Sequence, residues 1–577
     1  MIGVDYYPEH WDENPSKLER MDKDLSIMLE NGIEMIRIGE FAWSLIEPED
    51  GQFDFSFLDK VFEKAGKTTI KVMLCTPTAT PPPWLIRKHP EILQKDAYGH
   101  TRHFGSRRHY CYNSPVYKRH VKRIVTKLAE RYGQEENLFA WQLDNEFGCE
   151  DTTYCYCEDC DEAFRDYLED QYGEIDRLNR TWGTVFWSQV YNEFSQIETP
   201  KSTNSFKNPH KLLDFRRFST VSIESFSKLQ SDIIRKHSQK PITHNFMVNF
   251  SEIDYKRLEA QYDFVSYDNY FPKTDYNPAY AAFNFDLMRS LQRKPFTVLE
   301  QQPGRVNWQE RNMYRSAGWM EYVTQLGMEH GANNSVIFRF RALPFGAEQY
   351  HNGVLGYDGD PEKSKRLQVL SGLSKKKPVT DFSDVKTALY FDYEVGWMHE
   401  INGVCRDFSY FDALIDMYQP LFEKNEKVDI VFKDSDLSPY ETIIIPYAIH
   451  LPEEMKEKLN RADAKVLITC MTDLKTANSH IVSERPLGID LRGLTFEIPD
   501  FGAIYNKEFT FEGDRITGDM WFEEIELKKG VRQGKWEDSA LSSGIPVIAS
   551  EDEKTMYVGT VLSAEDWEKI YKRYGII

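Results

Sequence analysis

The N-terminal part of the sequence, residues 1–380, repeats one unit: a short apolar run followed by a longer amphipathic stretch. EMIRIGEF (34–41) follows the helical MDKDLSIMLENG (21–32), and TTIKVMLCTPT (68–78) precedes the helical SPVYKRHVKRIVTKLAERYG (114–133). Further strand-like runs are NLFAWQLDNEFG (137–148), PITHNFMV (241–248), DFVSYDNYF (263–271), PFTVLEQQPG (295–304) and NSVIFRFR (334–341). Repeated strand–helix pairs require a parallel sheet, and about eight of them predict a closed (β/α)8 TIM barrel over residues 1–380.

Polar residues follow several of these apolar runs, at the point where each predicted strand ends. In a parallel barrel the carboxyl ends of the strands lie on one face, and that face carries the active site. We therefore expect these side chains to converge. They are Glu40, Asn145, Glu146, Asp268, Asn269 and Glu300.

Two of these glutamates suit the hydrolysis of a glycoside. Glu146 in WQLDNEFG and Glu300 in TVLEQQPG each end an apolar strand, about three strand–helix units apart. A retaining glycosidase needs two carboxyl groups about 5–5.5 Å apart, one protonated and one ionised. Asn145 is placed to contact the sugar 2-hydroxyl. A lone strand-end glutamate usually caps a helix or forms an ion pair, but the Asn-Glu pair with a second glutamate favours a catalytic site.

The charge of the chain excludes some functions. The formal net charge is −21, and so acidic a surface repels phosphate backbones and anionic lipid. We expect no nucleic-acid or membrane partner. The start, MIGVDYYPEHWDENP, lacks the basic and apolar regions of a signal peptide, and no apolar run approaches the roughly 20 residues that a bilayer requires. A cytoplasmic location is expected.

A second domain is predicted after the polar linker SKKKPVTDFSDVK (374–386). Strand-like runs with helices between them indicate an α/β unit, and the sequence becomes β-like after Gly493. The strand-like runs are KTALYFDYEV (386–395), VDIVF (428–432), ETIIIPYAI (441–449) and AKVLITC (464–470). We expect a catalytic barrel at 1–380, an α/β domain at 381–565 and a short helical tail at 566–577.

The motifs of residues 1–360 resemble glycoside hydrolase family 42, in that family's order. They are GVDYYPEHW (3–11), RIGEFAWSLIEPEDGQFDF (37–55), TPTATPPPWL (76–85), GSRRHYCYNSPVY (105–117), QLDNEFG (142–148), TWGTVFWS (181–188), EQQPGRVNW (300–308) and GAEQYHNGVLG (346–356). The resemblance implies a retaining exo-β-galactosidase without an organic cofactor. Its substrates would be galactosides or galacto-oligosaccharides with a terminal β-D-galactosyl group.

The same resemblance implies roles for individual residues. Glu146 matches the acid/base and Glu300 the nucleophile. Asn145 and Arg108 match sugar-binding positions, although Arg107 is adjacent and competes for the second. Three further positions match residues that line the galactose subsite: Trp308, Glu348 and His351. The flat face of a tryptophan suits the C–H side of a pyranose.

Two alternatives remain open. The same machinery could prefer another sugar such as an α-L-arabinopyranoside, which lacks the hydroxymethyl group of galactose. A subsite that hydrogen-bonds O6 would reject that sugar, and Glu348 and His351 are the residues to consider. The second alternative, a non-catalytic sugar-binding protein, is disfavoured because both glutamates and their Asn and Arg neighbours are present.

Eight cysteines occur, and three of them form the C-x-C-x2-C run Cys155, Cys157 and Cys160. In an intracellular enzyme such a cluster is typical of a metal site, and zinc prefers four tetrahedral ligands. By resemblance to part of family 42, Cys111 is the fourth ligand of a structural four-cysteine zinc site. Metal-free reduced thiols are the alternative. We assign Cys149 to the active-site loop and Cys470 to a buried core.

The family also provides an expectation for the C-terminal part. The α/β unit after residue 380 resembles the family's amidotransferase-like second domain, which assists trimer assembly, so we expect a homotrimer. Many members continue into a small β-domain. Here that domain is expected to be reduced or absent, because text resembling the end of the second domain reaches almost to Ile577.

Overall fold

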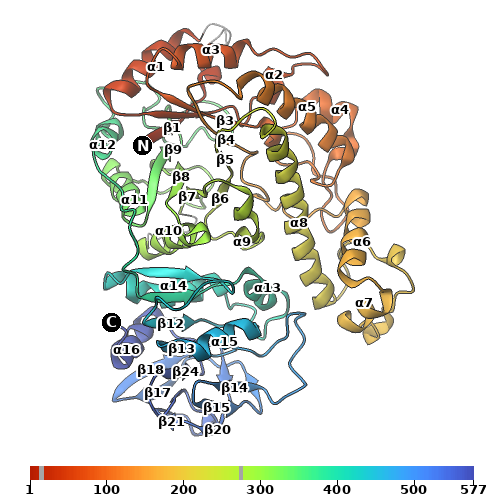
Figure 1. Cartoon of the computed structure of the whole chain (residues 1–577), viewed down its shortest axis with the longest axis vertical. Helices are drawn as coiled ribbons and strands as arrows, with labels where there is room; N and C mark the ends of the chain where they lie inside the picture. The colour runs from red at the N-terminus through yellow and green to blue at the C-terminus, as the bar shows by residue number, and fades with distance from the viewer. Residues whose placement is uncertain (12–17, 272–276) are drawn as a thin grey trace. The chain divides into compact units, whose positions relative to one another are not determined.

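In the computed structural model, which describes residues 1–11, 18–271 and 277–577, the strand–helix repeats share one nine-stranded parallel sheet (Figure 1). The strand order is β5-β4-β3-β2-β1-β9-β8-β7-β6. Only His244 separates β5 from β6, so the two edges of the sheet meet and the barrel is nearly closed. The predicted parallel α/β barrel is confirmed. The strands are β1 (Ile2–Asp5), β2 (Met35–Ile38), β3 (Lys71–Cys75), β4 (Leu138–Gln142), β5 (Ile242–Thr243), β6 (Asn245–Met247), β7 (Ser266–Asn269), β8 (Phe296–Gln301) and β9 (Ala332–Ile337).

Helices follow the strands, as the sequence pattern predicts. Helix α5 (Pro115–Tyr132) shows why: Ser114 caps its first turn by accepting a hydrogen bond from the Tyr117 amide, and Pro115 occupies the first helical position. Its buried residues recur every three to four positions and face the sheet. The other helices up to residue 380 are α1 (Glu19–Glu30), α2 (Trp43–Ile46), α3 (Ser56–Ala65), α4 (Pro83–Lys88), α6 (Glu158–Tyr172), α7 (Ile175–Trp182), α8 (Pro209–Ile234), α9 (Tyr255–Leu258), α10 (Pro278–Gln292), α11 (Ala317–Glu329) and α12 (Lys365–Leu373).

Side chains fill the interior of the barrel in layers. An apolar layer comes from five strands: Met35, Met73, Ala140, Leu299 and Val336. Two residues further along β2 and β4, on the same face, stand the buried polar residues Arg37 and Gln142. Pairing of β8 shifts register between Val298 and Gln301, and such an irregularity re-aims side chains. The neighbours Leu299 and Glu300 can therefore both contribute to the interior.

The C-terminal part of the chain forms a seven-stranded sheet in the order β11-β10-β12-β13-β24-β23-β21. The first five strands are parallel, and β23 and β21 continue the sheet antiparallel. The strands of this sheet are β10 (Thr387–Tyr390), β11 (Val428–Val431), β12 (Thr442–Ile445), β13 (Lys465–Thr469), β21 (Val531–Arg532), β23 (Val547–Ala549) and β24 (Thr555–Val558). Small antiparallel sheets use β14 (Gly488–Leu491), β15 (Leu494–Glu497), β16 (Phe501–Gly502), β17 (Lys507–Phe511), β18 (Asp514–Gly518), β19 (Phe522–Glu523), β20 (Glu526–Lys529) and β22 (Gly534–Trp536).

Four helices accompany this sheet: α13 (Tyr393–Asn402), α14 (Tyr410–Glu423), α15 (Glu453–Arg461) and α16 (Ala564–Tyr574). Helix α16 is an integral part of the fold. Its Trp567 and Tyr571 are fully buried, and the Tyr571 hydroxyl donates to the Met417 carbonyl of α14 over 2.9 Å.

The chain divides into two units. The barrel unit comprises Met1–Asn179, Ser188–Ser205 and Phe215–Thr380. The second unit comprises Arg180–Trp187, Phe206–Asp214 and Asp381–Ile577. Among the residues that the structure describes, none of the helices combines the length and apolar character that crossing a bilayer demands.

Candidate active site

Three carboxyl groups meet at the carboxyl ends of the barrel strands. Glu300 lies in β8, Asp268 lies in β7, and Glu146 lies in the loop after β4. Carboxylate oxygens of the three residues lie within 4.8 Å of one another, and all three side chains are buried. The separation of the two glutamates falls in the class that retaining glycosidases use and below the roughly 6.5–9.5 Å of inverting ones.

The loop after β4 holds Glu146 in a strained backbone conformation. Asp144 and Glu146 have φ values of 52° and 47°, and Gly148 follows with 83°. The Glu146 amide donates to Oδ1 of Asn245 over 3.0 Å, and the Asn145 amide donates to Oδ1 of Asp144 over 2.8 Å. Positive φ at residues other than glycine costs free energy and persists where surrounding contacts impose it, which is common at functional sites.

The buried cation Arg37 links Glu300 of the acidic cluster to Asp5 and Asn145. Its Nη1 donates to Oδ1 of Asp5 over 2.6 Å and to Oε1 of Glu300 over 2.7 Å, and its Nη2 donates to Oδ1 of Asn145 over 2.6 Å. The Tyr270 hydroxyl donates to the other Glu300 oxygen over 2.7 Å. Both carboxylate oxygens of Glu300 are therefore fixed before any substrate arrives.

Burial governs the ionisation of this cluster. It raises the pKa of Glu300 to about 7, with the Glu146 carboxylate adding to the rise while Arg37 and the Tyr270 hydroxyl oppose it. Burial, followed by the charges of Glu300 and Glu146, also raises the pKa of Asp268 well above its ordinary value. Carboxyl groups this close share protons near neutral pH.

Asn145 and two arginines surround the Glu146 carboxylate. Asn145 Nδ2 donates to Oε2 of Glu146 over 3.0 Å, and Arg108 Nη1 donates to the same oxygen over 3.2 Å. Arg107 Nη1 lies 3.8 Å from it. Arg108 is fully buried, whereas the Arg107 side chain retains 26 % exposure, and both also pair with Glu150. Both arginines thus belong to the site, and Arg108 makes the closer contact.

Two of the three subsite candidates, Trp308 and His351, lie near Tyr270, which contacts Glu300. The third, Glu348, accepts a hydrogen bond from the His351 amide through its carbonyl. Trp308 is 47 % exposed, and its ring centroid stands 5.6 Å from that of Tyr270 in an edge-on arrangement. The His351 ring, 6.4 Å from the same tyrosine, is buried, and neither ring nitrogen has a partner among the described residues. Burial lowers the pKa of His351 to about 4, so it is neutral near pH 7. Glu348 forms an ion pair with Arg339.

Four cysteines form a buried cluster, and none of them is in a disulfide: Cys111, Cys155, Cys157 and Cys160. Their sulfurs lie within 4.8 Å of one another, with 3.4 Å between Cys111 and Cys160 and 3.5 Å between Cys157 and Cys111. The Asn113 backbone amide donates to Cys111 Sγ and its side chain to Cys160 Sγ, each over 3.3 Å. Cys157 occupies the N-cap position of helix α6, and a helix N-terminus favours a thiolate. Cys149 stands outside this cluster, and Cys470 is fully buried.

Comparison with known proteins identifies the family. A family profile described as "Beta-galactosidase" matches residues 5–375, and one described as "Beta-galactosidase trimerisation domain" matches residues 385–576. The chain belongs to glycoside hydrolase family 42. The predicted family resemblance is confirmed, and it extends over both units.

Family 42 relatives match most of the chain. A "Beta-galactosidase" of Thermus thermophilus is 40% identical over 510 residues, covering 85% of this chain and 78% of that protein. "Beta-galactosidase BgaH" of Haloferax lucentense is 40% identical over 474 residues, covering 79% and 70%. Among solved structures, the β-galactosidase of the psychrophilic Marinomonas ef1 superposes with a TM-score of 0.91 at 31% identity, covering 100% of this chain and 91% of that one. The Halorubrum lacusprofundi enzyme superposes with a TM-score of 0.93 at 31% identity, covering 99% and 89%.

Sequence reasoning missed several members of this family 42 site. Arg37, Tyr270 and Asn245 contact the carboxyl cluster, but none was singled out as a candidate. Arg37 did carry a signal, because a charged residue inside the apolar run EMIRIGEF has to be paired if the strand is buried. Tyr270 and Asn245 carried none, since both residue types are ordinary at strand ends.

Proposed function

We propose that this chain hydrolyses terminal non-reducing β-D-galactosyl residues with retention of configuration. The observation that carries the proposal is the placement of the Glu146 and Glu300 carboxylates within 4.8 Å of one another in a site that also holds Asn145 and two arginines. Relatives at 40% identity are named β-galactosidases, which supports the substrate class. Galactosides and galacto-oligosaccharides are the proposed substrates.

The proposed reaction has two steps that use the same pair of residues. Glu300 attacks the anomeric carbon while Glu146 protonates the departing glycosidic oxygen, which leaves a covalent galactosyl ester on Glu300 and releases the aglycone. Glu146 then removes a proton from water, which attacks the same carbon and frees Glu300. The hydrogen bonds of Arg37 and Tyr270 keep Glu300 oriented, and they also favour its ionised form.

We propose that the neighbouring residues recognise galactose. Asn145 would contact the 2-hydroxyl, and Arg108 would bind sugar oxygens beside Glu146. Trp308 offers an aromatic face to the pyranose. His351 has two buried ring nitrogens free of protein partners among the described residues, so it and Glu348 would bind hydroxyls far from the scissile bond, O6 included.

The nucleophile is tested by replacing Glu300 with Ala and adding azide. Hydrolysis of a nitrophenyl β-galactoside should fall by several orders of magnitude, and azide should restore turnover with α-galactosyl azide as the product. Glu150→Ala with azide is the matched control, because Glu150 pairs with the arginines but is half exposed. Absence of rescue, or a β-configured azide, would rule out this role.

Substrate preference is tested with a panel of nitrophenyl glycosides, followed by galacto-oligosaccharides of defined linkage. The β-D-galactoside should exceed the α-L-arabinopyranoside in kcat/KM by at least tenfold if O6 is bound. The opposite order would favour an arabinopyranosidase. Negligible turnover of every glycoside, with retained sugar binding, would favour a non-catalytic sugar-binding protein.

We propose that the four clustered cysteines hold Zn²⁺. A zinc ion with four thiolates at about 2.3 Å places its sulfurs about 3.8 Å apart, close to the separations found here. The Asn113 donors would stabilise the thiolates. Four protein ligands leave no open position, so the metal would brace the segment that follows Glu146 and take no part in the chemistry.

We propose that the second unit assembles the chain into a homotrimer. The match to a profile described as a trimerisation domain supports this, as do three consecutive exposed apolar residues of the second unit: Val185, Phe186 and Trp187. Analytical ultracentrifugation of the full chain should give three times the monomer mass.

The parallel five-stranded core of the sheet supports an amidotransferase-like fold. The thiol cluster supports a cytoplasmic location, because thiolate ligands require reduced cysteines.

A further inference from the structure

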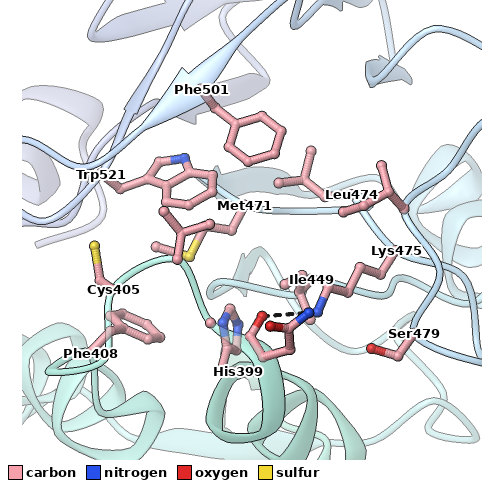
Figure 2. A pocket seen from close by; sticks show the side chains of 14 residues that line it. His399, Cys405, Phe408, Ile449, Met471, Leu474, Lys475, Ser479, Phe501 and Trp521 are labelled. Carbon is pink, nitrogen blue, oxygen red and sulfur yellow. Dashed lines mark hydrogen bonds between the residues drawn. The ribbon is translucent and has the colours of Figure 1, made fainter. Parts of the chain in front are cut away.

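The second unit contains a cavity of about 200 Å³ beyond the carboxyl ends of β12 and β13 (Figure 2). Segments that follow both strands line it, together with the end of α13 and the loop after that helix. In open α/β sheets this is the edge at which ligands bind. Much of the wall is apolar: Phe408, Ile449, Met471, Leu474, Phe501 and Trp521.

One cation, Lys475, lines this apolar cavity. The residue is only 5 % exposed, and no acidic side chain of the described residues lies within 4.0 Å of its Nζ. The nearby Asp473 pairs instead with Lys456 over 2.6 Å. Among the residues that the structure describes, the ammonium of Lys475 bonds only to the carbonyls of Met398 and Asn402, over 3.5 and 3.4 Å, at the outer limit of hydrogen bonding.

The hydroxyl of Ser479 faces the same cavity and is also unsatisfied. Ser479 is 6 % exposed, and its Oγ has no hydrogen-bond partner among the described residues. Its turn is fixed within the second unit, because His480 Nε2 bonds to the Thr181 carbonyl over 2.5 Å and His210 Nδ1 bonds to the Asn478 carbonyl over 2.7 Å. The donor is therefore built into the wall.

The electrostatics of the wall favour an anion. Burial lowers the pKa of Lys475 to about 8, so the cation is retained near pH 7 but is poorly compensated. Burial lowers the pKa of the neighbouring His399 to about 4, and its Nε2 bonds to the Tyr447 carbonyl over 2.8 Å, so it is neutral. A negative group placed between Lys475 and Ser479 would satisfy both donors.

We propose that this cavity binds a small monocarboxylate with an apolar body. The carboxylate would accept hydrogen bonds from Lys475 and Ser479, and the apolar part would pack against Phe501 and Trp521, which lie on the opposite side of the cavity in Figure 2. The two aromatic rings stack with centroids 5.0 Å apart and form a flat surface. A cavity of about 150 Å³ accommodates benzene, so 200 Å³ accommodates a ring with a carboxyl group.

Competing ligand classes fit less well. A phosphate carries more charge and more acceptors than one ammonium and one hydroxyl satisfy. A sugar would bring several hydroxyls against walls that are largely apolar, where unpaired polar groups are costly. A capping role of Lys475 at the carboxyl end of α13 accounts for its two long contacts but not for the unpaired Ser479 hydroxyl.

The test uses the full chain and two fluorinated probes that differ in charge. Titration of 4-fluorobenzoate and 4-fluorobenzamide, followed by ¹⁹F NMR, should show saturable binding of the benzoate and at least tenfold weaker binding of the amide. Equal binding of both probes, or binding of neither, would refute the proposal. This comparison needs no variant, so it does not depend on whether a substituted chain folds.

Variants then locate the site. Lys475→Met should weaken benzoate binding at least tenfold, while Lys528→Met, at an exposed lysine of the same unit, should leave it unchanged. Ser479→Gly removes the hydroxyl and suits the positive φ of 61° at this position, and it should also weaken benzoate binding. Unaltered benzoate affinity in Lys475→Met would overturn the assignment. The assignment would also be overturned if the wild type bound no benzoate and Lys475→Met changed the mass of the assembled protein in solution. The cavity would then be a contact surface between copies of the chain. Hydrolysis of a nitrophenyl β-galactoside should be the same in all four proteins, because the cavity contains no residue of the proposed catalytic site.

Discussion

Nη1 of Arg37 donates to Oε1 of Glu300 over 2.7 Å, and both side chains are buried inside the barrel. The same nitrogen also serves Asp5 over 2.6 Å. One guanidinium therefore compensates two carboxylates and opposes the rise that burial causes in the pKa of Glu300. This relationship makes the ionisation of the proposed nucleophile depend on a residue from a different strand.

Replacing Arg37 with Lys should therefore alter the pH dependence of the reaction. A lysine ammonium cannot reproduce the planar fork that serves Asp5, Glu300 and Asn145 together. The pKa of Glu300 should rise, so the acidic limb of kcat/KM should move to higher pH by about one unit, and kcat/KM at pH 7 should fall roughly 10- to 100-fold. Arg123→Lys, at a partly exposed arginine, is the control and should leave the limb in place. An unshifted limb in Arg37→Lys would contradict the electrostatic link.

Asp268 should tolerate replacement by Asn. Burial raises the pKa of Asp268 well above its ordinary value, which favours the neutral acid, and the amide of Asn has nearly the same shape and does not ionise. The bond that its Oδ2 accepts from Asn245 over 2.6 Å can be kept. We expect less than a tenfold change in kcat/KM, whereas Asp268→Ala, which removes the acceptor of one Asn245 side-chain hydrogen bond, should lose more. A fall of more than 100-fold in Asp268→Asn would show that the carboxylate is ionised in the working enzyme.

The barrel could be predicted from local sequence because its strands are short apolar runs, buried on both faces, and its helices repeat apolar residues every three to four positions. The motif NLFAWQLDNEFG, for instance, places β4 at Leu138–Gln142 and the polar residues directly after it. Other features depend on contacts between distant segments. Assigning Arg180–Trp187 and Phe206–Asp214 to the second unit requires the three-dimensional structure, because the sequence runs on through both segments without a linker-like composition.

Some features of the candidate site could likewise be predicted from local sequence, whereas others depend on contacts between distant segments. Glu146 and Glu300 could be proposed because each ends an apolar strand and because the family motifs surround them. The ionisation of the carboxyl cluster could not be predicted from the sequence, because it depends on the burial of Glu300 and on its distances from Arg37 and Glu146. The role of Tyr270 could not be predicted from the sequence either. Its hydrogen bond to Glu300 depends on the register of β7 against β8, which shifts between Tyr267 and Asp268.

Removal of the proposed zinc should lower stability without changing the chemistry. Chelation, or Cys155→Ser, should lower Tm by roughly 5 °C or more, because the metal binds only the folded cluster. The pH profile of kcat/KM should keep its shape. Metal analysis should find about one zinc per chain in the wild type and in Cys149→Ser, whose cysteine stands outside the cluster. Loss of activity at unchanged Tm would show that the cluster does more than brace the fold.

Glu300→Gln should stabilise the protein while abolishing its activity. The folded-state pKa of Glu300 is raised from 4.5 to about 7, so the folded protein binds this proton more tightly than the unfolded chain. The free energy of unfolding of the wild type therefore falls as the pH rises from about 4.5 to about 7, by an amount on the order of 3 kcal/mol. Glutamine does not ionise, so the variant escapes this loss. Its Tm should exceed that of the wild type at pH 8, and the difference should vanish near pH 4.5.

Glu150→Gln provides a control of opposite sign for this prediction. Although burial acts to raise it, the neighbouring Arg108 and Arg107 lower the pKa of Glu150, so its contribution to stability is present above the unfolded pKa and is lost as the pH falls. Replacing Glu150 should therefore lower Tm near pH 7, where replacing Glu300 raises it. Thermal unfolding of the three proteins between pH 4.5 and pH 8 compares both effects. A Tm of Glu300→Gln below that of the wild type at pH 8 would contradict this prediction. The attraction of Arg37 would then outweigh burial, and the pKa of Glu300 would not be raised in the folded protein.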